Sequence, residues 1–412
     1  MNLQIDQQRL QSEIHELALI TEAEPPVVTR VVFSVADLRA RAWLAEKCRD
    51  ADLKLRTDAV GNTFAQWRGS DPSAPAVGTG SHIDAIPNAG KYDGVVGVLG
   101  GLEAIRALQR ANFIPANSVE LLLFTSEEPT RFGIGCLGSR LLSGMLSPEG
   151  AARLTDSNGD SLETVRRAAG FSGDLASVRL PSAYYKAFVE LHIEQGPMLE
   201  QKQIPIGIVE KIAAPASAKI QIEGSGGHAG AVLMPYRRDA LCAASEFILA
   251  VESAARNANA IDTVATVGIC DVFPGAINSI PSRVRLTLDV RDTDLARRDA
   301  VMRQISEATS AISAKREVPI CTDLLNADTP ADCSPFVTEA LAASCRTHNF
   351  PYLHLVSRAY HDSLFMSRIA PTAMLFIPCR HGYSHRPDEY ASPEDIARGT
   401  LILAETLARL SS

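Results

Sequence analysis

The chain alternates between short, continuously apolar runs and longer stretches in which apolar residues recur every three or four positions. The first pattern predicts buried strands, and the second predicts helices with one apolar face. Helices are predicted at Val35–Asp50 and Val95–Ala111, with strands between them and a buried strand at Val119–Phe124. Helices that alternate with strands in this way predict an α/β domain, a mixed and mostly parallel sheet covered by helices.

The spacing also predicts which helix faces point inward. At the N-terminus, an amphipathic helix is predicted from the apolar positions Leu3, Leu10, Ile14 and Leu17. The helix Val35–Asp50 follows Ser34, a residue that suits the N-cap position. Its inward-facing residues are predicted to be Val35, Leu38, Ala42 and Ala45.

A second pattern occupies residues 216–328, which we predict to be a smaller α+β domain inserted into the first. Its elements are predicted as a strand at Ala218–Glu223, a helix at Asp239–Asn257, strands at Thr263–Cys270 and Arg283–Arg291, and a helix at Asp294–Ala314. The segment Ala213–Ala218 interrupts the pattern before it, and Asn326–Cys333 is interpreted as the return linker. Residues 1–215 and 329–412 then form the main domain.

Composition limits the classes of partner. The 412 residues carry a net charge of −8 without a basic tract, which argues against nucleic acid and favours a small-molecule substrate. The eight cysteines form no C-x-x-C pair, as expected for reduced thiols in a cytoplasmic protein. No apolar run reaches the ~18 residues of a membrane span. The first twenty or so residues are too polar for a signal peptide.

The first motif with chemical content is GSHIDAIPNAGKYDG, which connects a predicted strand to the helix Val95–Ala111. It offers His82, Asp84 and Asp93, and imidazole with carboxylate suits a divalent cation of the Zn or Mn type. Asp84 follows His82 by two residues and could orient the imidazole by a hydrogen bond without binding the metal itself. Ordinary surface polarity is the alternative for an isolated H-x-D loop.

The second motif is the adjacent pair Glu127 and Glu128, directly after the buried strand Val119–Phe124. Ligand sites in open α/β sheets lie at this end of the strands. One carboxylate can bind metal while the other acts as a general base. Alternatively, the pair could begin a helix at Pro129 and complement its dipole.

The third motif is VELHIEQG, residues 189–196. Alternation along a strand places Glu190, His192 and Glu194 on one face, with Gln195 at its end. A histidine on an apolar strand is often a hydrogen-bonded core residue. Acids on the same face favour a ligand instead.

Together with segments around His228, Tyr360 and His385, these motifs resemble the di-metal amidohydrolases of the aminoacylase and carboxypeptidase type. Within that family the chain resembles the hydantoinase/carbamoylase branch, which cleaves N-carbamoyl amino acids, ureidopropionate, allantoate and ureidoglycolate. The segments most similar to ureidoglycolate amidohydrolases are GKYDGVVGVLG, FTSEEPTRFG, GHAGAVLMP and SRAYHDSLFM.

The resemblance implies two divalent metal ions per subunit, Mn²⁺ or Zn²⁺, with Co²⁺ or Ni²⁺ also compatible with such ligands. The implied ligands are His82 and His192 on one ion, Glu128 and His385 on the other, and Asp93 between them. Glu127 is implied as general base and His228 as a group that stabilises the transition state. The implied substrate-binding residues are Gln195, Asn278, Arg291, Tyr360 and His361.

The implied reaction is metal-dependent hydrolysis of a linear C–N bond in an N-carbamoyl or ureido acid, with ureidoglycolate conversion to glyoxylate, ammonia and CO₂ expected first. N-carbamoyl-L-amino-acid hydrolase and allantoate amidohydrolase are the alternatives within the branch. A binding or scaffold protein with a decayed site should have lost ligands, but all five remain. The resemblance also implies a homodimer, in which the insert pairs two subunits and His228 reaches the partner's site. No nucleic acid and no membrane are expected as partners.

Overall fold

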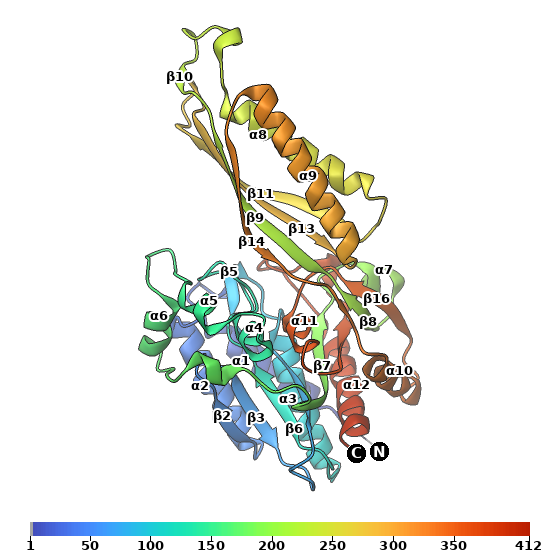
Figure 1. The fold of residues 1–412 in the computed structure, drawn as a ribbon. Helices are drawn as coiled ribbons and strands as arrows, with labels where there is room; N and C mark the ends of the chain where they lie inside the picture. The colour runs from blue at the N-terminus through green and yellow to red at the C-terminus, as the bar shows by residue number, and fades with distance from the viewer. Residues whose placement is uncertain (1–2) are drawn as a thin grey trace. The chain divides into compact units, whose positions relative to one another are not determined.

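The computed structural model describes residues 3–412, which divide into two compact units (Figure 1). The first unit contains the chain up to Glu210, together with Asp332–Ser357 and His361–Ser412. The second contains Lys211–Ala331 and the short return segment Arg358–Tyr360. The insert predicted at residues 216–328 lies within the second unit. None of the helices in the described part of the chain is long and apolar enough to cross a membrane.

The first unit is built on a large mixed sheet with the strand order β15-β8-β17-β7-β4-β6-β3-β2, and β16 pairs with β8. These strands are β2 (Lys54–Thr57), β3 (Thr63–Trp67), β4 (Ala76–Ser81), β6 (Val119–Leu123), β7 (Tyr185–Ile193), β8 (Ile206–Ile212), β15 (Ala331–Asp332), β16 (Tyr352–Ser357) and β17 (Thr372–Ile377). A separate antiparallel pair is formed by β1 (Val28–Arg30) and β5 (Ala85–Ala89). The pairs β17/β7, β7/β4 and β4/β6 are parallel, so the centre of the sheet is parallel and its flanks are antiparallel.

Helices cover this sheet, which confirms the predicted fold class. They are α1 (Gln7–Ala18), α2 (Val35–Asp50), α3 (Val95–Arg110), α4 (Leu137–Ser143), α5 (Pro148–Ala152), α6 (Leu162–Ala168), α7 (Met198–Lys202), α10 (Pro335–Thr347), α11 (Asp362–Met366) and α12 (Pro393–Ser411), with short 3-10 turns at Leu175–Val178 and Arg380–Gly382. Every residue of β4, β6 and β17 is buried, as expected for central strands covered on both faces. The one charged residue in β6, Glu120, accepts a hydrogen bond from Tyr185 Oη at 2.7 Å.

Helix α2 has the predicted bounds, and Ser34 caps it by accepting a hydrogen bond from Asp37 N. The predicted inward face is wrong, because Val35 is 72% exposed. The helix buries a neighbouring face that contains the ion pair Arg41 Nε–Asp37 Oδ2 at 2.9 Å. These two polar residues made that face look outward in the sequence. The N-terminal amphipathic helix was predicted correctly, because Leu10, Ile14 and Leu17 of α1 are buried.

The second unit has an antiparallel four-stranded sheet of order β11-β13-β9-β14 and a small ladder between β10 and β12. Its elements are β9 (Ala214–Glu223), β10 (Gly227–His228), α8 (Ala240–Asn257), β11 (Val264–Phe273), β12 (Ser279–Ile280), β13 (Arg283–Asp292), α9 (Leu295–Arg316) and β14 (Ile320–Ala327), with a 3-10 turn at Met234–Tyr236. Helices α8 and α9 share one core with this sheet, in which Phe247 and Val251 of α8 are buried.

In this unit one prediction is wrong and one strand was missed. The segment Ala214–Ala218 does not interrupt the pattern but forms the first half of β9, paired on both sides. Strand β14 was not predicted at all. Its residues are mostly exposed and do not alternate between apolar and polar types, because it is an edge strand and not a buried one.

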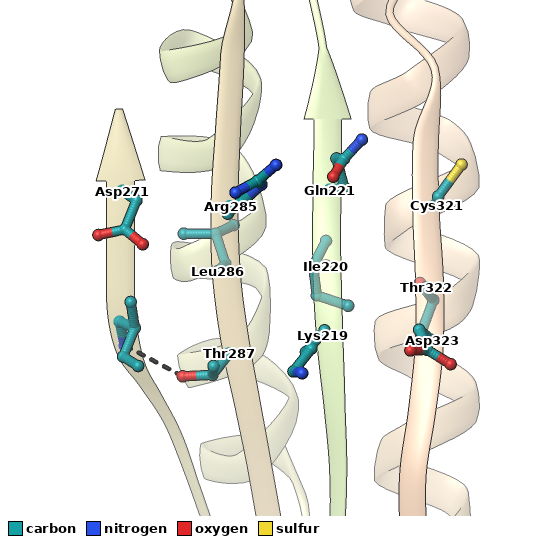
Figure 2. Close-up of a pocket in the computed structure, with 11 residues that line it drawn as sticks. Lys219, Ile220, Gln221, Asp271, Arg285, Leu286, Thr287, Cys321, Thr322 and Asp323 are labelled. Atoms are coloured by element: carbon teal, nitrogen blue, oxygen red, sulfur yellow. Dashed lines mark hydrogen bonds between the residues drawn. The ribbon is translucent and has the colours of Figure 1, made fainter. Parts of the chain in front are cut away.

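The face of the four-stranded sheet shown in Figure 2 is polar and lines a cavity of about 580 Å³. Cross-strand neighbours on this face pair opposite charges, with Asp271 opposite Arg285 and Lys219 opposite Asp323. The charges balance, and neither histidine nor glutamate is among the lining residues. The cavity is therefore a solvated sheet face without a set of metal ligands.

Candidate metal centre

The chain turns sharply between β5 and α3 and presents Asp93 there. Gly94 follows with a φ of +67° and caps α3. A Cβ atom at Gly94 would lie 2.5 Å from the His82 ring, so glycine lets the turn approach the imidazole. His82 itself comes directly after the buried strand β4. The motif therefore places both side chains at the carboxyl end of the parallel strands.

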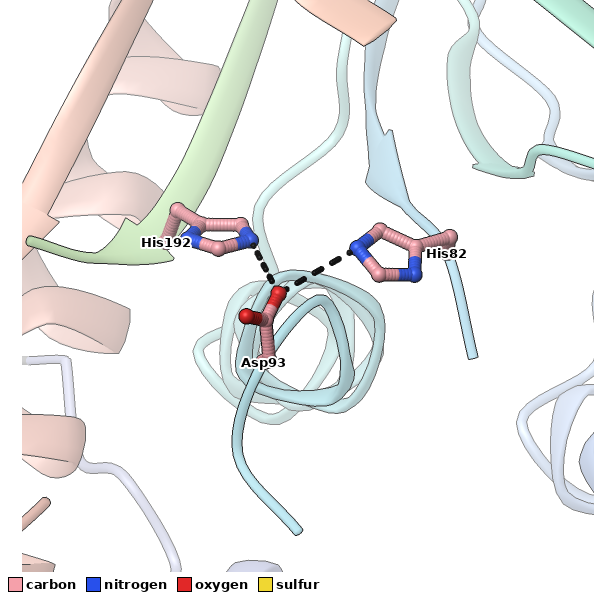
Figure 3. A group of neighbouring side chains, drawn as sticks. All are labelled: His82, Asp93 and His192. Atoms are coloured by element: carbon pink, nitrogen blue, oxygen red, sulfur yellow. Dashed lines mark ion pairs between the residues drawn. The ribbon is translucent and has the colours of Figure 1, made fainter. Parts of the chain in front are cut away.

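The carboxylate of Asp93 lies between two groups of side chains. Its Oδ1 atom is 3.4 Å from His82 Nε2 and 3.2 Å from His192 Nε2 (Figure 3). Its Oδ2 atom is 3.4 Å from His385 Nε2, and that nitrogen is 3.3 Å from Glu128 Oε1. All five side chains implied as metal ligands are thus brought together, with Asp93 shared by both groups.

This arrangement fits a pair of divalent ions. In each group, one atom from every side chain lies within 4.8 Å of the others. Imidazole nitrogen with carboxylate oxygen suits Zn and Mn, and a shared carboxylate can bridge two such ions. A third cluster, Glu190 with His192 and His361, is different. Glu190 already accepts hydrogen bonds from Ser81 Oγ at 2.7 Å and Ser363 Oγ at 2.6 Å. This buried carboxylate therefore links β7 to β4 and to α11.

Hydrogen bonds to backbone carbonyls orient two of the histidines. His82 Nδ1 lies 2.9 Å from the carbonyl oxygen of Asp84, and His192 Nδ1 lies 2.9 Å from that of Ile193. A proton on each Nδ1 leaves the Nε2 lone pair directed at Asp93, as metal binding requires. The sequence predicted that Asp84 orients His82. The structure places the Asp84 backbone in that role, since its Oδ1 atom is 3.7 Å from His82 Nδ1.

The Asp84 side chain instead holds the two glutamates. Its carboxylate oxygens accept from Glu127 N at 3.2 Å and Glu128 N at 3.1 Å. The alternative that this pair begins a helix at Pro129 is wrong, because the next helix, α4, begins at Leu137. The two side chains diverge from neighbouring backbone positions. Glu128 reaches His385, whereas Glu127 Oε2 lies 3.9 Å from His82 Nε2.

The charges of the centre are strongly perturbed. Burial and the carboxylates of Glu128, Asp362 and Asp93 raise the pKa of Glu127 well above its usual range. Burial and the Asp93 charge also raise the pKa of Glu128 to about 7. The hydrogen bond with Asp93 raises the pKa of His385 to about 9. Without cations, the centre therefore retains protons that a bound divalent ion would displace.

The surroundings of Asp93 include two residues that sequence analysis missed, Ser384 and Glu389. Glu389 Oε1 accepts from Tyr92 N at 2.7 Å and Asp93 N at 3.1 Å. Ser384 Oγ has a single proton to donate, and both Glu389 Oε2, at 3.0 Å, and Asp93 Oδ2 lie within hydrogen-bond distance of it. Nothing in the sequence except proximity to His385 pointed to them.

Gln195, implied as substrate-binding, donates from Nε2 to Asp93 Oδ2 at 2.6 Å.

His361 belongs to the first unit and lies beside the centre. Its ring centroid is 4.5 Å from that of His192, and its Nε2 atom is 3.1 Å from Ser357 Oγ. The next residue, Asp362, is buried and accepts from Ser139 Oγ at 2.5 Å. Burial and the nearby Glu190 charge raise the pKa of Asp362 to about 8.

The other implied residues lie in the second unit. Arg291 forms an ion pair with Asp289 at 2.7 Å, and its guanidinium lies 5.4 Å from the centre of the Tyr360 ring. His228 is exposed on β10, which pairs with the strand that follows Asn278. Arg291 lies near the end of the ten-residue strand β13, whereas β12 lies just before the start of β13. At about 3.3 Å per strand residue, Arg291 is therefore roughly 30 Å from β12 and from the neighbouring His228.

Known proteins provide the context for this centre. The profile of peptidase family M20/M25/M40 matches residues 78–409. The chain is 51% identical to the ureidoglycolate hydrolase of Arabidopsis thaliana, over 100% of this chain and 88% of that protein. It is 37% identical to an N-carbamoyl-L-amino-acid amidohydrolase of Pseudomonas sp. (strain NS671), over 98% of each chain. The crystal structure of AtUAH in complex with glyoxylate superposes with a TM-score of 0.94 at 51% identity, covering 99% of this chain and 98% of that one.

Proposed function

The chain belongs to peptidase family M20/M25/M40, and from that membership we propose that it is a metal-dependent amidohydrolase acting on ureidoglycolate. Hydrolysis at the ureido carbonyl uses one water and releases CO₂, ammonia and hydroxyglycine. Loss of a second ammonia from hydroxyglycine then leaves glyoxylate. The observation that carries the proposal is the Asp93 carboxylate between two histidine and carboxylate groups. The relative at 51% identity and the glyoxylate complex support this substrate.

In this proposal two divalent ions are held per subunit, Mn²⁺ or Zn²⁺, with Co²⁺ or Ni²⁺ as substitutes. His82 and His192 would hold one ion and Glu128 and His385 the other, with Asp93 available to both. When bound, the ions polarise the ureido carbonyl and lower the pKa of water. The charge of two cations would also lower the pKa of Glu127, which the neighbouring carboxylates raise in their absence.

The chain's own residues then position and move the proton. Glu127 takes the proton of the attacking water and delivers it to the leaving nitrogen. Its backbone is held by Asp84, and Cys136 Sγ donates to its Oε1 at 3.5 Å, leaving Oε2 toward the centre. Arg291 binds the substrate carboxylate, since a guanidinium can form two parallel hydrogen bonds with it.

The assembly proposed is a homodimer with shared sites. His228 and Asn278 lie roughly 30 Å from Arg291 along β13, so the three cannot contact one small substrate within a single chain. If all three act on it, His228 and Asn278 come from the partner subunit. There His228 stabilises the developing oxyanion, while Gln195, Tyr360 and His361 line the substrate from the subunit that holds the ions. Eight free cysteines are consistent with a cytoplasmic location.

Two further substrates remain alternatives. Similarity to the Pseudomonas N-carbamoyl-L-amino-acid amidohydrolase supports an N-carbamoyl-L-amino acid as substrate. Allantoate is the other alternative, because the allantoate amidohydrolase of Escherichia coli is 31% identical over 93% of each chain. A scaffold protein with a decayed site is disfavoured, because all five ligand side chains and Glu127 are present.

A substrate panel tests the proposal. The chelated enzyme is reconstituted separately with Mn²⁺, Zn²⁺, Co²⁺ and Ni²⁺, and ammonia release is measured on ureidoglycolate, allantoate and an N-carbamoyl-L-amino acid. Ureidoglycolate should have the highest kcat/KM. A higher value for N-carbamoyl-L-amino acids would reassign the chain to the carbamoylases, and full activity without metal would reject the di-metal mechanism.

A further inference from the structure

Behind the metal centre, the first unit contains a second cavity of about 430 Å³ that the proposed reaction does not use. It lies between α1, the residues that precede Asp93, and the segment between β17 and α12. Its lining includes Gln11, His15, Lys91 and Arg380. A volume of this size is in the range of small-molecule sites.

The two side-chain cations of this cavity each lie against an aromatic ring. The rings of Tyr92 and Tyr390 meet edge to face with centroids 6.0 Å apart. Lys91 Nζ lies 5.4 Å from the centre of the Tyr92 ring, and the Arg380 guanidinium lies 4.1 Å from that of Tyr390. Each ring contact favours a cation at that position and leaves its N–H groups able to donate elsewhere.

Neither cation has a carboxylate partner within ion-pair distance among residues 3–412. Lys91 is half-buried, and its charge together with burial lowers the pKa of the nearby His15. The side-chain nitrogen of Gln11 is also buried without an acceptor in the described chain. The cavity therefore holds two cations without an ion-pair partner, one half-buried and one exposed, beside a buried Gln11 donor that lacks an acceptor.

The acids in the cavity wall do not neutralise these donors, because both are already engaged. Asp388 accepts from Arg386 Nε at 2.6 Å and Arg386 Nη2 at 2.8 Å. Glu389 uses Oε1 for Tyr92 N and Asp93 N, and Oε2 for Ser384 Oγ. Lys91, which is half-buried, and Arg380, which is exposed, are therefore both available to an anion that enters from solvent.

We propose that this cavity binds a small dianion through a phosphate group, with Lys91 and Arg380 as its charged donors and Gln11 as a neutral one. Two fixed positive charges favour a doubly charged oxyanion over a monocarboxylate or chloride. The cavity volume accommodates a small organic residue attached to the phosphate. The ligand would lie against Tyr92, one residue from Asp93, but outside the metal centre.

Isothermal titration of the full-length protein with inorganic phosphate tests this proposal. Chelation removes metal first, so that phosphate cannot bind to ions at the catalytic centre. The wild type should bind about one phosphate per chain saturably, with acetate and chloride much weaker at the same ionic strength. Lys91→Met and Arg380→Met should each raise the dissociation constant about tenfold, as expected for one lost charge-assisted hydrogen bond.

Matched controls are Lys54→Met and Arg39→Met, which remove the same charges from exposed positions elsewhere on the first unit. They should bind phosphate like the wild type. Phosphate should also raise the unfolding temperature of the wild type and the controls but not of the double variant Lys91→Met/Arg380→Met. No saturable binding across the millimolar range, or equal binding by cavity and control variants, would overturn the proposal.

The same titration identifies the source of the phosphate group. Glycerol 3-phosphate binding more tightly than inorganic phosphate, with the same loss in Lys91→Met, supports a phosphorylated small molecule. Equal affinities support free phosphate. Ammonia release measured with and without saturating glycerol 3-phosphate in the metal-reconstituted enzyme then reports whether occupancy affects Asp93 and the catalytic centre.

Discussion

The Oδ1 atom of Asp84 accepts a hydrogen bond from the backbone N–H of Glu127 at 3.2 Å. Its second carboxylate oxygen accepts from the next residue at 3.1 Å. One side chain on the loop after β4 thereby sets the backbone of the two glutamates after β6. A carboxylate can serve both N–H groups because both of its oxygens are acceptors.

Replacing Asp84 with asparagine should therefore weaken the centre without removing any ligand. An amide has one acceptor oxygen, so one backbone N–H faces an NH₂ group. We expect Asp84→Asn to lower metal affinity or kcat about 10–100-fold, as is usual for residues that orient ligands. Metal content and kcat are the measurements. Asp52→Asn, at an exposed turn, is the control, and wild-type values for Asp84→Asn would contradict this role.

Glu127 and Glu128 should behave differently although they are adjacent. Glu127→Gln is expected to lower kcat on the order of 10²–10⁴-fold while retaining metal, because it removes a general base. Glu128→Gln should instead lose metal, because it removes an atom 3.3 Å from His385 Nε2. Elemental analysis and kcat distinguish the variants. If Glu127→Gln loses metal and keeps turnover, the two roles are exchanged.

Metal removal should reverse the dependence of stability on pH. In the metal-free protein the pKa of Glu128 is raised to about 7 by burial and Asp93, and that of His385 to about 9 by Asp93. Both values exceed those of the unfolded chain, so the stabilisation is complete below the unfolded values and is lost as pH rises through about 7 and about 9. The unfolding temperature with chelator should fall between about pH 4.5 and about pH 9.

Metal binding must displace these protons, so the rise in unfolding temperature caused by Mn²⁺ or Zn²⁺ should grow over the same range. Thermal unfolding with chelator and with metal measures both effects. The double variant Glu128→Gln/His385→Asn should flatten the metal-free profile. A metal-free protein that becomes more stable toward pH 9 would contradict the charge arrangement described here.

The shared-site dimer can be tested with two inactive variants. Subunits carrying His228→Ala and Glu127→Gln are mixed, unfolded and refolded together. If His228 acts on the partner's site, each mixed dimer has one site with both lesions and one intact site, so part of the activity should return. Dimers of each variant refolded alone are the controls. No recovery in verified mixed dimers would place His228 in its own subunit's site or outside catalysis.

Local patterns in the sequence identified the elements that depend on local interactions. A continuous apolar run predicted β6, and the three-to-four spacing with Ser34 predicted the bounds of α2. The candidate ligands His82 and Glu128 directly follow the buried strands β4 and β6. The full ligand set was implied by the resemblance of several motifs to the di-metal amidohydrolases.

Only the tertiary structure decided what depends on contacts between distant segments. The buried face of α2 is a neighbour of the expected one and contains the pair Asp37–Arg41, since a polar residue can be buried when its partner is buried with it. Edge strand β14 is mostly exposed, so its residues do not show the alternation of apolar and polar types that predicts a strand. The Asp84 side chain meets a backbone more than forty residues away, and Glu389 reaches Asp93 N across nearly three hundred residues. No local periodicity encodes such hydrogen bonds, because they form only after the sheet has brought the loops together.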